Sequence, residues 1–335
     1  MNRRGFLTTM ASGAAFLLAN RSGEGAGEVA PQLIKTAQQG RKTRLALIRT
    51  RDRATGIKRA IDLLGINPVQ GKDVLLKPNF NSADPFPGST HNDTLTHLIL
   101  QLRNMGAKNL TIGERSGIPE IGDVMRKKGI PDLAAKLGVG LINFDDLPNA
   151  DWVHITPEKS HWMNGFDVAK PIIDSPCIVT TCCLKTHGSG GVFTMSLKLS
   201  VGITRKANMI ELHTSLVSIQ KMIAEINLAY QPALVVMDGI DVFVDKGPSH
   251  GPLKQANVIL AGTDRIAIDA IGVAVLKEQG SNNAIMGKKI FEQEQIARAV
   301  ELGLGISRPE EIELVSDDAA GKEYAEKLTE IALQG

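Results

Sequence analysis

The sequence is poor in cysteine: it has three in 335 residues, and all of them fall in one apolar run from Cys177 to Cys183. If this run is a strand, Cys177 and Cys182 lie about 16 Å apart, at a rise of roughly 3.3 Å per residue, far beyond the reach of a disulfide. The absence of a disulfide framework favours folding in a reducing compartment. The chain also lacks established zinc or iron–sulfur spacings, so an iron–sulfur cluster held by this chain alone is not expected.

Other features are missing as well. The net charge is only +2 and no long basic run is present, so nothing points to a nucleic-acid partner. No stretch of about 20 strongly apolar residues occurs, and a permanent transmembrane segment is therefore not expected. What remains is an ordinary globular composition, 43% apolar and 22% charged, which can bury a sizeable core.

The N-terminus reads Met1-Asn-Arg-Arg-Gly-Phe-Leu7 and continues with weakly apolar residues to Ala19. A basic start followed by such a segment is typical of a secretory signal, and the paired arginines favour a twin-arginine (Tat) signal peptide over residues 1–30. We therefore expect the Tat export machinery as a partner and the periplasm or another exported compartment as the destination. The alternative is a frayed basic end of a cytoplasmic protein. The Gly/Glu/Ala-rich run from Ser22 to Val29 favours a processing region, although no clean cleavage site is visible.

From Thr43 onward, short β-branched runs alternate with amphipathic segments, which predicts an α/β fold with a mostly parallel open sheet and helices on both faces. We expect a single domain over residues 40–333, with a possible lobe boundary near 150–175. The expected strands are Arg44–Arg49, Asp73–Lys77, Asn109–Gly113, Gly140–Phe144, Cys177–Leu184, Ala233–Met237, Asn257–Ala261 and Glu311–Val315.

Helical periodicity is clearest from Leu95 to Met105, where one apolar stripe ends before Gly106, and a second stripe runs from Leu216 to Ile226. The segment 266–276 is apolar nearly all round, so it should be buried, and its one carboxylate, Asp269, must then be paired or hydrogen-bonded. The region 151–175 reads as a hairpin insertion, with strands around Trp152 and Trp162. This hairpin either covers a sheet edge or serves as a lid or partner surface.

The strongest functional signal follows the cysteine strand. Lys185 and His187 stand at the end of that strand, and Gly188, Gly190 and Gly191 lead into a segment 192–198 that we expect to begin a helix. Glycine N–H groups, a helix N-terminus and a lysine together favour anion binding, and a histidine can move a proton near neutral pH. The spacing matches neither the Walker nor the dinucleotide motif. The alternative is a flexible loop with a solvated lysine.

Further candidates follow other strands. Pro78 holds Lys77 extended at a strand end, so Lys77 and Asn79 should project from a stiff turn, although Pro and Asn also suit an ordinary turn. Carboxylates at strand ends, Glu114 and Asp238 among them, could act as general acid or base or bind a metal. Cys183 with His187, and Glu211 with His213, leave a transition-metal site open without any established spacing, so the cofactor stays unknown.

Taken together, these residues resemble the DUF362 family, a domain of unknown function. The resemblance rests on the following segments: Val74–Asn79, Leu184–His187, Ser196–Lys198 before Gly202, Val236–Gly239 with Gly247-Pro248, and Ala261–Ala270. It implies an α/β fold with the site where these motifs meet. Members often carry a twin-arginine leader and some are fused to ferredoxin-like cysteine clusters, which suggests redox or metal chemistry nearby. This chain departs from that pattern, with three cysteines on one strand and with Leu199 where Asn is expected.

The function that these observations favour is an exported enzyme acting on an anionic small molecule. In this interpretation Lys77, Asn79, Lys198 and the glycines bind the substrate. Catalysis would use His187 with Lys185 and Asp238. The alternatives are a non-catalytic exported protein that binds an anion or metal, and an accessory factor for exported redox proteins.

Overall fold

The computed structural model describes residues 42–188 and 190–335, so the predicted signal peptide and Ser189 lie outside the described residues. Eight strands form the path of one sheet in the order β11-β1-β10-β9-β7-β2-β3-β4, and β8 pairs with β7 alone. Their bounds are β1 Thr43–Arg49, β2 Asp73–Lys77, β3 Asn109–Glu114, β4 Gly140–Asn143, β7 Ile178–His187, β8 Val192–Thr194, β9 Leu234–Phe243, β10 Leu253–Gly262 and β11 Ile312–Val315.

Most pairs in this sheet are parallel. Strand β2 is parallel to β3 and β7, β7 to β9, β3 to β4, and β1 to β11, whereas β10 runs antiparallel to both of its neighbours. The expected mostly parallel α/β sheet is therefore confirmed. Because the parallel strands share one direction, the carboxyl ends of β2, β3 and β7 meet at one edge of the sheet, where ligands bind in open α/β folds.

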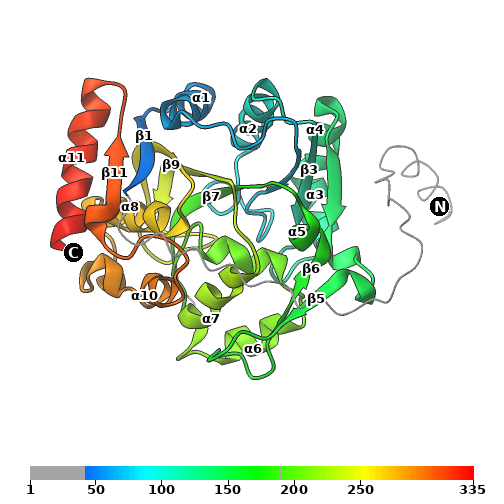
Figure 1. Cartoon of the computed structure of the whole chain (residues 1–335). Coiled ribbons are helices and arrows are strands. Elements are labelled where there is room, and N and C mark those ends of the chain that lie inside the picture. The colour runs from blue at the N-terminus through cyan, green and yellow to red at the C-terminus, as the bar shows by residue number, and fades with distance from the viewer. Residues whose placement is uncertain (1–41, 189) are drawn as a thin grey trace.

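Helices cover both faces of the sheet (Figure 1). Their bounds are α1 Arg53–Leu64, α2 Asn92–Asn104, α3 Ile121–Lys127, α4 Ile130–Leu137, α5 Lys170–Asp174, α6 Asn208–Thr214, α7 Ile219–Ile226, α8 Arg265–Glu278, α9 Asn283–Met286, α10 Glu294–Glu301 and α11 Ala319–Gln334. Helices α1 to α4 share one core cluster with Ala46 and Ile48 of β1, and α8, α10 and α11 share another with Leu45 and Leu47 of the same strand. This alternation along β1 places the two helix groups on opposite faces.

Local sequence accounts for the best-defined helices. In α1, the Asp52 side chain accepts from the N–H of Thr55 at 3.2 Å, and Gly65 ends the helix at φ 65°, a conformation that costs glycine little. Helix α8 is buried from Arg265 to Leu276, as its nearly continuous apolar sequence predicts. Within the described residues, no helix has both the length and the hydropathy to cross a membrane.

The hairpin insertion is present, but one of its strands was predicted wrongly. Strand β5 (Trp152–Ile155) pairs antiparallel with β6 (Phe166–Ala169), and the segment around Trp162 lies in the loop between them. The reason is that Trp162 is buried: its ring packs against Phe166, and its Nε1–H donates to the carbonyl of Met222 at 3.2 Å. The indole therefore anchors the loop to α7 instead of pairing in a strand.

Candidate functional site

The carboxyl edge of the sheet gathers most of the predicted site residues. Lys77 ends β2, Glu114 ends β3, and Lys185 and His187 end β7. Strand β7 runs well past β2, because Lys77 lies opposite Thr180. The long β7 thus carries Lys185 and His187 to a point beyond the end of its shorter neighbour, where loops and 3₁₀ turns cover them.

Lys77 is not a free cation at this edge. Its Nζ lies 2.5 Å from Glu114 Oε1, both side chains are 1% exposed, and Nζ also donates to the carbonyl of Pro78 at 2.9 Å. Burial lowers the pKa of Lys77 and raises the pKa of Glu114, against their mutual attraction. A Cβ on Gly202 would come within 2.5 Å of Glu114 Oε1, so glycine is required there. The predicted substrate-binding role of Lys77 stays a prediction, and here its charge is neutralised by Glu114.

The carboxylate of Glu114 also organises the surrounding backbone. It accepts from the N–H of Phe80 at 2.9 Å and from its neighbour's N–H, that of Arg115, at 2.9 Å. Asn79 lies in the same turn, where its N–H donates to Thr90 Oγ1 at 2.8 Å and its buried Oδ1 has no partner among the described residues. Hydrogen bonds therefore hold the backbone of the turn after β2, and one amide oxygen there is left unsatisfied.

Positive charge collects around Lys198, which begins the 3₁₀ turn Lys198–Ile203. The charges of Lys185 and Arg115 act on Lys198 and, together with burial as the largest cause, lower its pKa to about 8. Lys185 is fully buried and donates to the carbonyl of Gly88. Lys198 has neither a hydrogen-bonding nor an ion-pair partner within the part of the chain that the structure describes. Three cationic side chains thus lie near one another. None of the three forms an ion pair among the described residues, and of the three only Lys198 makes no side-chain hydrogen bond either.

His187 belongs to this group. A Cβ placed on Gly191 would lie 2.9 Å from Lys198 Cε and 3.0 Å from His187 Nδ1, so both side chains close on the same spot. Burial, followed by the charges of Lys198 and Lys185, lowers the pKa of His187 to about 2, and its buried Nδ1 has no partner among the described residues. The ring is therefore neutral at physiological pH and keeps one nitrogen unsatisfied.

The segment after the glycine-rich turn is a strand and not the predicted helix. No helix begins at Val192; residues Val192–Thr194 form β8, which pairs back onto Lys185–His187. The β-branched and aromatic side chains of this segment suit a strand. The helix N-terminus expected to help bind an anion is thus absent at this position. Gly188 and Gly190 are exposed, which brings the buried group close to the surface at this turn.

Asp269 positions the chain just before Lys198. Its two carboxylate oxygens accept from the N–H groups of Ser196 at 2.7 Å and Leu197 at 3.0 Å. The prediction that this buried carboxylate must be hydrogen-bonded is confirmed. Burial raises the pKa of Asp269 to about 7, although the two N–H donors act in the opposite direction.

Asp238 is held on a different set of partners. Its Oδ2 accepts from Arg53 Nε at 2.7 Å and from Thr94 Oγ1 at 2.5 Å, and its Oδ1 accepts from the N–H of Ile240 at 3.2 Å. The strand does not end before Asp238 as predicted, because β9 continues to Phe243. Asp238 lies opposite Cys183 in the sheet and makes no hydrogen bond to His187 within the described residues. Its catalytic role remains a prediction.

The cysteines and the remaining histidines form no metal centre with the side chains that the structure describes. Burial raises the pKa of Cys183 to about 11 and that of Cys182 well above its ordinary value, so both thiols stay protonated. Within residues 42–188 and 190–335, no group of three or more His, Cys, Asp or Glu side chains is arranged to hold a metal ion. His213, on α6, lies near His187 and lowers its pKa slightly further.

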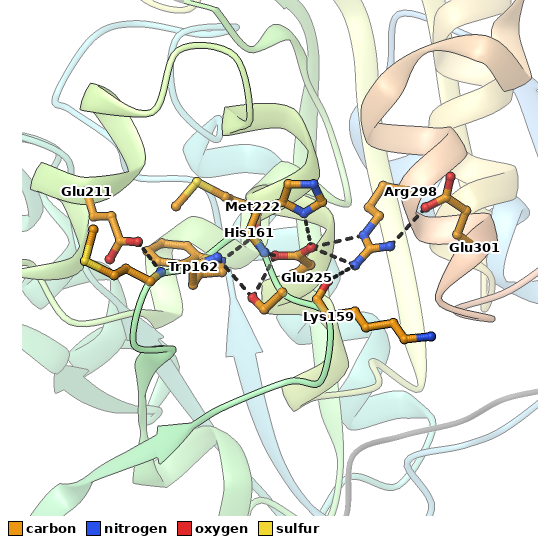
Figure 2. A network of polar contacts seen from close by, with 10 residues as sticks. Lys159, His161, Trp162, Glu211, Met222, Glu225, Arg298 and Glu301 are labelled. Carbon is orange, nitrogen blue, oxygen red and sulfur yellow. Dashed lines mark hydrogen bonds and ion pairs between the residues drawn. The ribbon is translucent and has the colours of Figure 1, made fainter.

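Sequence reasoning missed several participants. Arg115 was not singled out, although it directly follows the carboxylate that ends β3, and Arg53 and Thr94 stand at the starts of α1 and α2 with no motif around them. It also missed the buried Glu225 of α7, which Figure 2 shows between Arg298 of α10 and the loop that joins β5 to β6. A single glutamate in a helix does not indicate such a role by itself. The available signal is its position on the buried face of α7.

Glu225 makes five contacts, and three of them fasten that loop. Its Oε2 accepts from Ser160 Oγ at 3.0 Å and from the N–H of His161 at 2.9 Å, and its Oε1 lies 2.6 Å from His161 Nδ1. Arg298 donates to Oε1 through Nε at 3.0 Å and Nη2 at 2.8 Å. The first residue of the same helix, Ile219, lies beside Gly190, since a Cβ built on that glycine would be 3.3 Å from Ile219 Cγ2.

Two open grooves lie away from this edge. The larger, of about 560 Å³, lies near the start of β1 and is lined by charges of both signs, among them Lys42, Arg44, Asp264 and Glu313. Asp264 there is occupied by the N–H groups of Ala267 at 2.9 Å and Ile306 at 2.8 Å. The smaller lies between β11 and α11. The charged residues that line the smaller groove, Lys322, Glu326 and Glu330, are exposed, unlike the buried cations at the carboxyl edge.

Comparison with known proteins places the chain in a family. The family described as "Domain of unknown function (DUF362)" matches residues 74–274, more than half of the chain. The chain therefore belongs to the DUF362 family, and the matched range contains every site residue predicted from the sequence. No curated protein sequence matches the chain significantly. Among solved structures, the lactate racemase apoprotein from Thermoanaerobacterium thermosaccharolyticum is similar over 86% of each chain, with 12% sequence identity and a TM-score of 0.44.

Proposed function

We propose that this protein is an enzyme that binds a small anionic molecule beside Lys185, Lys198 and Arg115 and moves a proton on it through His187. The observation that carries the proposal is Lys198, a buried lysine with no counter-charge in the part of the chain that the structure describes. An uncompensated buried charge is costly, and a bound anion would remove that cost. Arg115 and Lys185 would share the anion's charge.

The histidine fits a proton-transfer role once the anion is present. The lysine charges that hold His187 neutral would be offset by the ligand, so its pKa should rise toward the range in which a histidine accepts and returns a proton. Gly191 keeps the space between His187 and Lys198 free of a side chain. The turn around exposed Gly188 and Gly190 would provide the entrance.

A non-catalytic anion-binding protein is the second candidate, and one observation favours it. Catalytic histidines are commonly oriented by a hydrogen bond to the second ring nitrogen, and His187 Nδ1 has no partner among the described residues. Under this reading, the His187→Gln variant should bind sulfate normally and no substrate should turn over. If the protein is an enzyme, the unmodified protein should exchange a carbon-bound proton of a carboxylate ligand with D₂O. The His187→Gln variant should then still bind the ligand but lose this exchange.

Binding of sulfate, whose charge is constant above neutrality, should weaken as pH rises from 7 to 9.5. Lys198 is protonated below its pKa of about 8 and attracts the anion, and it loses that charge above it. The neighbouring titratable groups are Lys185, Arg115 and His187, and His187 stays neutral throughout this range. One charge-assisted hydrogen bond is worth about 1.5–3 kcal/mol, which corresponds to a roughly ten- to hundredfold loss of affinity. Equilibrium dialysis at a series of pH values measures it.

The Lys198→Met variant should show weak sulfate binding that no longer depends on pH in this range, whereas Lys170→Met, an exposed lysine paired with Asp174, should behave as the unmodified protein does. Equal sulfate affinity at pH 7 and 9.5, or unchanged binding in Lys198→Met, would exclude this anion site.

We also propose export through the Tat pathway, on the strength of Arg3-Arg4 and the weakly apolar segment after them. Replacing both arginines with lysine should leave the protein in the cytoplasm of its host, because the receptor reads the arginine pair and not merely positive charge. Cell fractionation with immunodetection measures this. Equal export of the variant and the unmodified protein would remove the proposal.

A further inference from the structure

We propose that Lys198 forms an imine with a small carbonyl compound that also carries a carboxylate or another anionic group. This inference rests on the proposed anion site and adds to it the class of substrate and the covalent step. It starts from a difference among the three lysines buried at the carboxyl edge of the sheet, Lys77, Lys185 and Lys198.

Two of these lysines already have partners. Lys77 is ion-paired with Glu114 at 2.5 Å and is 1% exposed, and Lys185 donates to a backbone carbonyl and is 0% exposed. Lys198 is 8% exposed and has no hydrogen-bonding or ion-pair partner within residues 42–188 and 190–335. It is thus the lysine of the three whose amine is both unengaged and nearest to the surface.

Its surroundings also favour the reactive form. An amine attacks a carbonyl carbon only when it is unprotonated, and enzymes obtain such lysines by desolvation or by placing a second cation beside them. Lys198 has both: burial and the charges of Lys185 and Arg115 lower its pKa to about 8. An appreciable fraction is therefore neutral near neutral pH.

The partners needed for the reaction are adjacent. His187 and Lys198 both lie against Gly191, where a Cβ would contact Lys198 Cε and His187 Nδ1. No hydrogen bond joins the two side chains among the described residues, so the bound substrate or a water would relay the proton between the reacting amine and the neutral imidazole. Arg115 keeps its proton and can hold the anionic group of the substrate. Asp269 fixes the backbone of Ser196 and Leu197, which sets the position from which the Lys198 side chain extends.

The step is balanced without an oxidant or reductant. The Nζ lone pair of neutral Lys198 attacks the carbonyl carbon, and the carbonyl oxygen takes up a proton to give a carbinolamine. Loss of the nitrogen-bound proton and of the hydroxyl group as water forms the C=N bond. The sum is amine plus carbonyl giving imine plus water, and His187 can carry the proton between nitrogen and departing oxygen.

Trapping with glyoxylate, a small aldehyde that carries a carboxylate, and sodium borohydride tests the proposal on the full chain. Borohydride supplies a hydride to the imine carbon, so an adduct at Lys198 becomes carboxymethyl-lysine, which peptide mass mapping locates. At limiting glyoxylate we expect at least tenfold more modification at Lys198 than at exposed Lys170. The yield should rise between pH 6 and 8, and sulfate should suppress it. Propionaldehyde, which lacks the carboxylate, should label Lys198 at least tenfold less.

The Lys198→Arg variant keeps the positive charge and cannot form an imine, so it should bind sulfate at pH 7 and lose the site-specific adduct. The map of the unmodified protein needs no variant and stands even if this one fails to fold. Sulfate binding without carboxymethylation of Lys198 overturns the imine proposal and leaves the anion site standing. Failure of both sulfate binding and trapping overturns the two proposals together.

Discussion

Replacing Lys77 with methionine is expected to lower the free energy of unfolding by about 3–5 kcal/mol, the usual consequence of removing one partner of a buried ion pair. Methionine fills most of the lysine's volume, so the loss comes from Glu114, which would be left 1% exposed without its cation. Urea unfolding followed by circular dichroism measures the change. A loss of this size is a large fraction of the stability of a typical domain.

The pH dependence of the stability of the Lys77→Met variant is a second test of the Lys77–Glu114 ion pair. Burial raises the pKa of Glu114 already, and without Lys77 its carboxyl should hold a proton in the folded state over a wider range. A raised folded-state pKa means that stability is greatest at low pH and falls as pH rises through the values between the unfolded and folded pKa. The variant should therefore recover part of its stability on acidification from pH 7 to 5.

The matched control is Lys206→Met, which breaks an ion pair of 2.7 Å with Glu120 whose side chains are 38% and 70% exposed. Exposed pairs contribute about 0–1 kcal/mol, so its unfolding midpoint should hardly move. A Lys77→Met variant as stable as this control would show that the Lys77–Glu114 pair does not organise the carboxyl edge of the sheet.

The Glu225→Gln variant should lose about 3–5 kcal/mol as well and should loosen the loop between β5 and β6. The carboxylate is fully buried and accepts from Ser160 as well as from Arg298 and His161, whose contacts Figure 2 shows. Glutamine retains the shape and removes the charge, so the Arg298 guanidinium, with 13% of its side chain exposed, would lack its buried counter-ion. Urea unfolding and the rate of tryptic cleavage after Lys159 measure the two effects.

Glu301 offers the control for this network, because it bonds the same guanidinium at 3.0 Å from an exposed position. Glu301→Gln should cost less than about 1 kcal/mol and leave cleavage at Lys159 unchanged. If Glu225→Gln behaved in the same way as Glu301→Gln, the buried carboxylate would not be what fastens the loop.

The sequence predicted the sheet well where strands are short, apolar and bounded by turns. The strand Asp73–Lys77 has its predicted bounds, and the α/β class with a mostly parallel sheet is confirmed. Strand ends were less predictable: β9 runs past Asp238 to Phe243, since pairing with β10 continues beyond the apolar run that marks the strand in the sequence. The antiparallel direction of β10 depends on the path of the segment that joins β9 to β10. Hydrophobic periodicity in the sequence does not indicate that path.

The positions of the candidate-site residues were likewise predictable only where they depend on local sequence. Placing Lys185 and His187 at a strand end required only the apolar run before them. The helix expected at Val192 is a strand instead, because the glycine turn folds that segment back on Lys185–His187. The pairing of Lys77 with Glu114 and the closeness of Arg115 to Lys198 depend on which strands are neighbours, and strand order comes from tertiary packing.

The central claim is that an anion binds between Lys198 and His187, and a crystal soaked in selenate tests it most directly. Selenate has the shape and charge of sulfate, and its anomalous scattering identifies it without ambiguity. We expect a selenate within hydrogen-bonding distance of Lys198 Nζ, beside Gly188, Gly190 and Gly191, and no selenate there in crystals of Lys198→Met. Selenate bound only at the groove near β1 or at exposed lysines, with nothing at Lys198, would contradict it.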